Sequence, residues 1–228
     1  MKNPDKQARK IQDMFKRIAR RYDLMNRLMT AGQDVRWRRE VIQRARLADG
    51  ALLLDLGAGT GDLARTALLQ QPGCRPVAMD FTLEMMRVGN QRGHLEWSAA
   101  DALNLPLPAG IFDAAVSGFL MRNVADIQQA MGEQYRILAG GGRIVILDTT
   151  RPRRSLIWPL LWLYFHLVIP TLGLLITGQR AAYTYLPTST EKFVSAEELA
   201  DSMQQAGFTG VGFRRLMFGT IAIHWGEK

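Results

Sequence analysis

The spacing of apolar positions changes its period once along the chain. In the first part the period is that of a helix, because Ile11, Phe15 and Ile18 fall on one stripe while basic and other polar residues occupy the remaining positions. This pattern predicts an amphipathic helix over residues 5–18. A second helix is predicted over residues 22–29, and a third follows it before the period changes.

After the third helix, short apolar runs alternate with helical segments, which is typical of a parallel sheet built from βαβ units. The predicted strands are residues 52–56, 76–80, 95–99, 114–118, 143–147, 211–216 and 220–225. The predicted helices between them are residues 62–69, 83–88, 127–138 and 196–206. Three consecutive glycines, Gly140 to Gly142, are expected to end the helix before the fifth strand.

The fifth predicted strand is followed by an almost wholly apolar segment. Residues 156–176 contain no formal charge and are long enough to span a bilayer. Pro159, Pro170 and Gly173 are expected to break a helix there, and a spanning helix would separate the last two strands from the rest of the sheet. We therefore expect a lid that lies on or dips into a membrane, or that caps an apolar pocket.

These elements predict one α/β domain of the Rossmann-like class. Its seven-stranded, mostly parallel sheet has helices before it and an apolar helical insertion after the fifth strand. We divide residues 1–228 into a basic helical cap (1–46), a core that binds the cofactor (47–150), the apolar insertion (151–190), and a final helix with two strands (191–228).

The net charge is +8, and the excess lies in the cap, which holds 14 Lys and Arg against 5 Asp and Glu. Such a block suits nucleic acid or an anionic membrane surface, and a solvated helix face without a partner is the third interpretation. The single cysteine, Cys74, indicates a reducing compartment. The first fifty residues contain no apolar run of the kind that forms a secretory signal. We therefore expect a cytoplasmic protein.

A glycine-rich turn joins the first strand to the next helix. Residues 55–61 read Asp-Leu-Gly-Ala-Gly-Thr-Gly, so backbone amides and a helix N-terminus face whatever binds there. The dinucleotide fingerprint needs a further glycine where this chain has Asp62. The turn instead resembles the first motif of S-adenosylmethionine (SAM) methyltransferases. A tight structural turn without a ligand is the alternative.

Two aspartates follow at the spacing expected of a SAM site. Asp80 ends the second strand, where a carboxylate can accept hydrogen bonds from both ribose hydroxyls. Asp101 follows the third strand, where methyltransferases of this class usually bind the adenine amine. The predicted cofactor residues are Asp55, Gly57, Gly59, Thr60, Gly61, Asp80, Phe81, Asp101, Ala102 and Gly118. The three histidines and one cysteine lack the spacing of metal ligands, so we expect no metal.

Three further runs carry a closer resemblance. Residues 22–26 read Tyr-Asp-Leu-Met-Asn, 122–124 read Arg-Asn-Val and 183–187 read Tyr-Thr-Tyr-Leu-Pro. Together with the glycine turn they are similar, in the same order, to the ubiquinone/menaquinone biosynthesis C-methyltransferase family. The resemblance implies transfer of a methyl group from SAM to a ring carbon of a polyprenylated quinol. Demethylmenaquinol or a ubiquinone precursor would be the acceptor, and S-adenosylhomocysteine the other product.

Arg122 and Asn123 are the predicted catalytic pair. They follow the fourth strand, at the edge where α/β sheets bind ligands, and could stabilise the phenolate that activates a quinol ring. The resemblance implies that the arginine acts through a water. Since arginine has a pKa above about 12, we interpret that role as electrostatic or as positioning the water, with a structural brace as the alternative. Asp101 is, by resemblance, a second catalytic candidate, which competes with its adenine role.

Further residues are expected beside the substrate or in a lid: Tyr22, Asp23, Asn26, Leu120, Met121, Tyr183 and Tyr185. Family members usually have glycine where this chain has Leu120, which leaves the accepted ring open. Another lipid or aromatic acceptor, such as a phospholipid headgroup, is the alternative. Nucleic acid is not expected, because the tetrapeptide that grips a flipped base is absent after the fourth strand. The expected partners are the quinol and, peripherally, the inner face of an anionic membrane; the oligomeric state, a homo-oligomer included, stays open.

Overall fold

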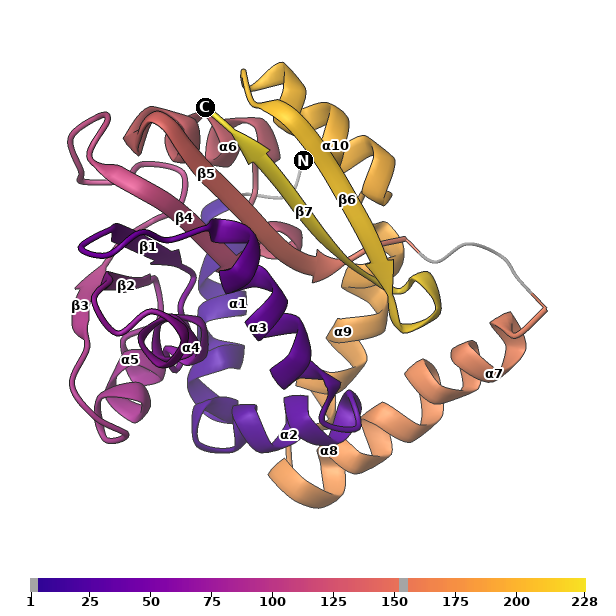
Figure 1. The fold of residues 1–228 in the computed structure, drawn as a ribbon. Coiled ribbons are helices and arrows are strands. Elements are labelled where there is room, and N and C mark those ends of the chain that lie inside the picture. Colours follow the sequence, from indigo (N-terminus) through magenta and orange to yellow (C-terminus); the bar gives the residue numbers. More distant parts are fainter. Residues whose placement is uncertain (1–3, 152–155) are drawn as a thin grey trace.

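The computed structural model describes residues 4–151 and 156–228, and its centre is a twisted seven-stranded sheet (Figure 1). The strands are β1 (Leu52–Leu56), β2 (Arg75–Asp80), β3 (Glu96–Ala99), β4 (Phe112–Gly118), β5 (Leu138–Thr149), β6 (Thr209–Leu216) and β7 (Ile221–Glu227). They lie in the order β3-β2-β1-β4-β5-β7-β6. The pairs among β1 to β5 are parallel, whereas β7 runs antiparallel to both of its neighbours. The predicted seven-stranded, mostly parallel sheet is confirmed.

Helices cover both faces of this sheet. They are α1 (Pro4–Ile18), α2 (Tyr22–Met29), α3 (Gln33–Ala45), α4 (Asp62–Gln70), α5 (Leu83–Asn90), α6 (Ile127–Ile137), α7 (Trp158–Leu163), α8 (Ile169–Thr177), α9 (Arg180–Lys192) and α10 (Ala196–Gln205). Leu53 of β1 packs with α3 and α4, and its neighbour Leu54 packs with α6 and α10. Because successive strand residues face opposite sides, a nearly continuous apolar run supplies two cores.

The glycines at 140–142 do not end a helix, so that prediction is wrong. α6 ends at Ile137, and Leu138 already pairs with Phe112 as the first residue of β5. The glycines lie inside β5, where the register against β4 shifts. A Cβ atom on Gly142 would lie 2.8 Å from the carbonyl oxygen of Ala139. Glycine is therefore required here by the close approach of the backbone at an irregular strand start.

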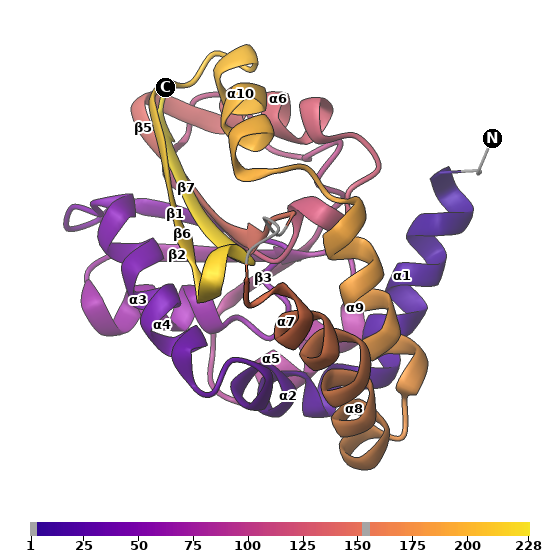
Figure 2. The same cartoon turned by 90° about the vertical axis from the view of Figure 1, so that its right-hand side faces the viewer.

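The two N-terminal helices lie over the carboxyl-terminal edge of the sheet (Figure 2). α1 crosses α5, where the Gln12 amide donates to the carbonyl of Phe81 at 2.8 Å and Lys16 pairs with Glu84 at 3.3 Å. A short 3₁₀ turn, Ala19–Arg21, connects α1 to α2. The predicted helical cap is thus present, and its position brings α2 next to the glycine turn.

The apolar run of the insertion forms one continuous helix from Trp158 to Thr177, so the expectation that prolines and a glycine break it is wrong. Pro159 lies in the first turn of α7, where no intrahelical N–H bond is lost. Between α7 and α8 a π-helical turn, Tyr164–Val168, widens the helix, and Ile169 N–H donates to the carbonyl five residues back. The wider turn accommodates the ring of Pro170, while Gly173 lets Tyr183 approach closely.

The helix from Trp158 to Thr177 is the only one in the described part of the chain that is long and apolar enough to cross a membrane, judged by length and composition alone. Only 22% of its apolar window is buried in the structure. It leads through α9 back to the sheet edge, so the predicted helical insertion after the fifth strand is confirmed.

Candidate functional site

The glycine turn after β1 has a backbone that few other residues could adopt. Gly57, Gly59 and Gly61 all have positive φ angles, of 67°, 58° and 81°. A Cβ on Gly57 would lie 2.8 Å from the side chain of Leu120. Glycine is therefore required at Gly57 both by the backbone angle and by the close packing of Leu120, and α4 begins immediately after the turn.

Asp55 sits beneath this turn, almost fully buried. One carboxylate oxygen, Oδ2, accepts a hydrogen bond from Ala64 N at 2.9 Å, and the other has no partner among the described residues. Burial raises the pKa of Asp55 to about 7. A buried carboxyl oxygen without a partner at the mouth of a glycine turn is suited to a donor group of a ligand.

Asp80, at the end of β2, shapes the same turn. Its Oδ2 accepts from Gly59 N at 2.8 Å and its Oδ1 from Thr82 N at 2.6 Å. Burial raises the pKa of Asp80, and the two backbone hydrogen bonds lower it. Phe81, the next residue, is half exposed and holds α1 through its carbonyl. Asp80 thus links the ends of β1 and β2.

A small pocket opens between the glycine turn, α2 and the ends of β4 and β5. The predicted residues that line it are Tyr22, Asp23, Asn26, Asp55, Gly57, Gly59, Thr60 and Gly118. Six further lining residues are not among the predicted site residues: Arg38, Ala58, Asp62, Leu63, Phe119 and Leu147. Predicted cap and cofactor residues, far apart in the chain, therefore meet at one pocket.

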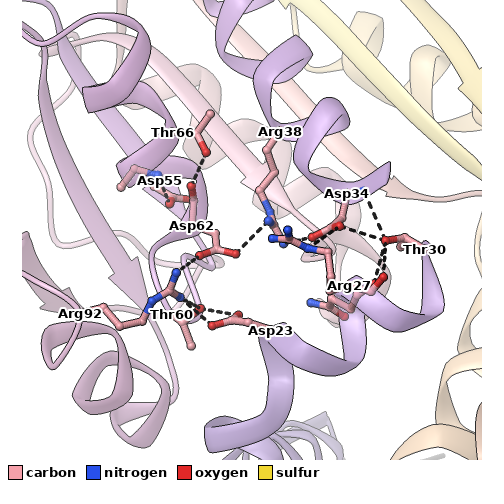
Figure 3. A network of polar contacts seen from close by, with 12 residues as sticks. Asp23, Arg27, Thr30, Asp34, Arg38, Asp55, Thr60, Asp62, Thr66 and Arg92 are labelled. Carbon is pink, nitrogen blue, oxygen red and sulfur yellow. Dashed lines mark hydrogen bonds and ion pairs between the residues drawn. The ribbon is translucent and has the colours of Figure 1, made fainter. Parts of the chain in front are cut away.

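A chain of ion pairs connects the cap to the glycine turn (Figure 3). Arg92 contacts Asp23 of α2 at 2.6 Å and Asp62 at 2.9 Å. Arg38 of α3 contacts the same Asp62 at 2.9 Å, and the hydroxyl of Thr60 donates to Asp23 at 2.7 Å. Burial and the charge of Asp62 raise the pKa of Asp23. Among the residues of this network that were not predicted site residues, the sequence had singled out only Asp62, because it stands where a dinucleotide fingerprint has its third glycine.

Arg122 lies in a short 3₁₀ turn, Met121–Asn123, that follows β4. Its Nη1 contacts Asp148 Oδ1 at 2.7 Å, with 7% of the arginine side chain and none of the aspartate side chain exposed. Its Nε has no partner among the described residues. Burial raises the pKa of Tyr22, and the charge of Arg122 lowers it, so that charge acts on a residue that lines the pocket.

Asp148 was missed by the sequence analysis, although a signal existed. It lies near the end of β5, and Asp55 and Asp80 occupy the corresponding ends of β1 and β2. The carboxyl ends of parallel strands meet at one edge, so a carboxylate at any of them is a candidate site residue.

Asn123 is fixed from two sides. Its Nδ2 donates to the carbonyl of Phe119 at 3.0 Å, and its Oδ1 accepts from the hydroxyl of Tyr185 at 3.1 Å. Tyr185 belongs to α9, so the last helix of the insertion docks on the turn that carries the predicted catalytic pair. Phe119 itself has a positive φ of 61°, and the centre of its ring lies 5.1 Å from the guanidinium carbon of Arg122. Strain of this kind persists where the surroundings hold it.

Other predicted site residues lie apart from the pocket. Asp101 is exposed and accepts a hydrogen bond from Leu103 N, while Ala102 and Met121 are buried in the main core. Tyr183 is buried within the insertion, and burial raises its pKa to about 12. The remaining predicted residue, Leu120, packs on the glycine turn, as its contact with Gly57 shows.

The glycine turn, the cap over it and the Arg-Asn pair beside it agree with one family. The model of the ubiE/COQ5 methyltransferase family matches residues 3–228. The chain belongs to this family. The resemblance noted in the sequence is confirmed, and the chain is a SAM-dependent C-methyltransferase of quinone biosynthesis.

Curated members of the family match over almost their full length. The ubiquinone/menaquinone biosynthesis C-methyltransferase UbiE of Desulfotalea psychrophila is 43% identical over 221 residues, which cover 96% of this chain and 90% of that protein. A demethylmenaquinone methyltransferase of Thermus thermophilus is 42% identical over 220 residues, covering 94% of this chain and 100% of that one. The two names differ in the quinones they mention, so family membership leaves the acceptor of this chain to be tested.

A solved structure supports the fold. A SAM-dependent methyltransferase from Thermotoga maritima superposes with a TM-score of 0.65 at 21% identity, covering 95% of this chain and 99% of that one. At such low identity the likeness concerns the arrangement of sheet and helices. It confirms the Rossmann-like class predicted from the sequence.

Proposed function

We propose that this family member binds SAM at the glycine turn and methylates a ring carbon of a polyprenylated quinol held between Arg122, Asn123 and the insertion. The observation that carries the proposal is the buried Arg122–Asp148 pair one turn beyond Gly118, a residue that lines the pocket. A cation kept at this edge of the sheet is suited to an acceptor that must become an anion before it reacts.

The residues of the pocket fit SAM. The positive φ angles of the glycines provide a backbone cradle, and the oxygen of Asp55 that lacks a partner suits the cationic end of SAM. Beyond the pocket itself, at the ends of β2 and β3, we assign the ribose hydroxyls to Asp80, and the adenine side to Asp101 and Ala102. Bound there, SAM supplies an activated methyl group, so the protein contributes orientation and exclusion of water.

Arg122 and Asn123 act on the acceptor in this proposal. Transfer of a quinol hydroxyl proton to water increases the electron density of the ring carbon, and a guanidinium close to the resulting oxyanion favours that transfer. After the ring carbon has gained the methyl group, the hydrogen of that carbon leaves as a proton to water. Asp148 is a positioning residue, because its contact fixes the guanidinium. Tyr185 positions Asn123 in the same way. Asp101 is exposed, and we keep its catalytic role as a secondary proposal.

The acceptor is tested by product analysis. Purified protein with SAM should methylate demethylmenaquinol or a demethylated ubiquinol precursor, detected by mass spectrometry as a gain of one methyl group on the ring. Phosphatidylethanolamine should not be methylated. Methylation of that lipid alone would contradict the proposal, because a headgroup amine needs no phenolate stabilisation.

We also propose where in the cell the enzyme works, from the chemistry of the proposed acceptor. A polyprenyl tail resides in a bilayer, so the protein works as a peripheral protein on the anionic inner face of the membrane, from the cytoplasm. The basic cap and the apolar insertion support this proposal. We further propose that cap, core, insertion and final strands act as one domain, since the ion pairs of Arg38 and Arg92 join cap and core.

SAM affinity is expected to rise as the pH increases through about 7, up to about pH 7.5, where an α-amino group begins to lose its proton. The pKa of Asp55 is raised to about 7, so the carboxyl retains its proton below that pH and becomes an anion above it. An anion in the pocket attracts the sulfonium and ammonium of SAM. Calorimetric titration of SAM should therefore show tighter binding at the higher pH, and Asp55→Asn should remove the dependence.

The raised pKa of Asp55 also makes the stability of the folded protein depend on pH. Between about pH 4, where an unfolded aspartate ionises, and about pH 7 the folded protein holds more protons at Asp55, so the free energy of unfolding should fall as the pH rises. Denaturant unfolding at a series of pH values measures this fall. Wild-type SAM affinity that does not change as the pH rises through about 7 would contradict the assignment of Asp55 to the cofactor site.

A further inference from the structure

The helix from Trp158 to Thr177 is apolar on its outward side as well as on its inward side. Its inward side chains pack on the insertion's own core, where Leu161, Phe165 and Ile169 are buried. The outward side chains form what we call the outer face: Leu160, Trp162, Leu163, Leu167, Leu174 and Leu175. Leu160 is 70% exposed and Leu175 is 75% exposed. A group of large apolar side chains exposed to water along one helix marks an interaction site.

Helix α2 extends the outer face sideways. It lies next to α8 in both views (Figures 1 and 2) and exposes Leu24 and Leu28, which are one helical turn apart. Arg20 and Arg21 precede Leu24 by one turn and are exposed. Arginines therefore border the apolar surface at the side of the cap. This arrangement matches a surface with an apolar interior and anionic headgroups above it.

The inward side of the same helix is tied to polar groups of the domain. The hydroxyl of Tyr164 donates to the carbonyl of Met29 at 2.7 Å, and His166 lies 3.4 Å from a carboxylate oxygen of Glu191. A helix that spanned a bilayer would have to break these contacts or take their partners into the hydrocarbon. The helix can therefore offer lipid its outer face only.

We propose that the outer face, together with Leu24 and Leu28, is a membrane-docking surface that lies in the plane of an anionic bilayer, with Arg20 and Arg21 at the headgroups. The bilayer, and not a second copy of the chain, is the occupant because the apolar face is bordered by cations that anionic headgroups complement. The proposal deepens the proposed function, on which it rests for the prenylated acceptor.

The insertion connects the proposed docking surface to the proposed site of methylation. The polypeptide continues from α8 into α9, whose Tyr185 hydrogen bonds to Asn123 beside Arg122. A quinol ring that reaches Asn123 is thus held by the same insertion that contacts the lipid. Its tail need not leave the bilayer for the ring to enter the pocket.

Vesicle sedimentation tests the proposal with the full chain. Wild type should pellet with vesicles of phosphatidylcholine and phosphatidylglycerol at low salt, and less with phosphatidylcholine alone. The variant Leu163→Ser/Leu167→Ser/Leu174→Ser should bind the anionic vesicles at least about tenfold more weakly. Arg20→Gln/Arg21→Gln should weaken binding to anionic vesicles and leave binding to neutral ones unchanged.

Matched controls come from the opposite edge of the sheet. Leu69 is 84% exposed near the end of α4, and Arg75 is exposed at the start of β2. Leu69→Ser and Arg75→Gln should leave vesicle binding unchanged. Circular dichroism and the Tm of each variant establish that it is folded. Equal losses in the controls and in the outer-face variants would overturn the proposal.

Other results would overturn it in distinct ways. Wild type that fails to pellet with anionic vesicles contradicts docking, and wild type that resists alkaline carbonate extraction indicates a spanning helix. Conversion of a wild-type dimer to a monomer by the leucine variant, with vesicle binding retained, assigns the face to a second copy. Methylation of a quinol with a short, water-soluble tail should survive in the docking variants. Vesicle binding without methylation of any quinol would contradict the proposed function alone.

Discussion

Replacement of Arg122 by alanine is expected to lower kcat for quinol methylation about 10²–10³-fold, while the dissociation constant of SAM stays within about threefold of the wild-type value. Arg122 follows the pocket-lining residues of β4 and is held by Asp148, and in our proposal it acts on the acceptor and not on the cofactor. Product formation by mass spectrometry gives kcat, and calorimetry gives the affinity for SAM.

This variant needs a control for stability, because it leaves the Asp148 carboxylate buried without its partner. Removing one member of a buried ion pair typically costs about 3–5 kcal/mol. Arg122→Gln/Asp148→Asn removes both charges and should recover stability but not turnover. Arg143→Ala breaks a more exposed ion pair of β5, with Glu227, away from the carboxyl-terminal edge of the sheet, and should leave kcat unchanged. If the affinity for SAM falls as far as kcat in both Arg122 variants, the arginine is a structural brace.

Asp80→Asn is expected to do the reverse, weakening SAM binding about 10- to 100-fold with kcat at saturating SAM little changed. An asparagine can still accept one of the two backbone hydrogen bonds, from Gly59 or from Thr82, but its NH₂ group then faces the other N–H. A hydrogen bond to a charged group contributes about 1.5–3 kcal/mol, which corresponds to this range of affinity. Proposed contacts with the ribose would be lost as well.

Asp113→Asn is the matched control for this prediction. Asp113 also accepts a backbone hydrogen bond, from Leu52 N at 2.7 Å, but at the amino-terminal edge of the sheet. Its replacement should leave the affinity for SAM unchanged. A loss of kcat in Asp80→Asn at saturating SAM, with unchanged affinity, would exclude Asp80 from the cofactor site.

Much of the fold was predictable because its signals are local. Every one of the seven predicted strands is present, and the predicted helix over residues 196–206 is α10, which begins with a capping box of Ser195 and Glu198. The errors have one physical origin. The glycines at 140–142 and Pro170 are helix-breaking residues by propensity, yet strand pairing placed the glycines in β5 and a π turn accommodated the proline.

The residues of the candidate site also fall into two groups, those that local sequence patterns predicted and those that they did not. The glycine turn and Asp80 were recognised from their spacing in the sequence. The turn follows one parallel strand and Asp80 ends the next, and the carboxyl ends of parallel strands lie at the same edge of a sheet. Asp148 and the ion pairs of Arg38 and Arg92 were not, since each joins residues of different elements far apart in the chain. No local pattern specifies which arginine meets which carboxylate.

The amino-acid sequence by itself determined the class of the fold, the glycine turn with Asp55 and Asp80, and the family, because these depend on periodicity and on short motifs. Only the tertiary structure decided that α2 covers the turn, that Asp148 holds Arg122, and that Trp158 to Thr177 form a continuous helix with an exposed apolar face. Those features depend on packing between distant segments. The same turn that the sequence identified is thus completed, in three dimensions, by residues that the sequence alone did not connect.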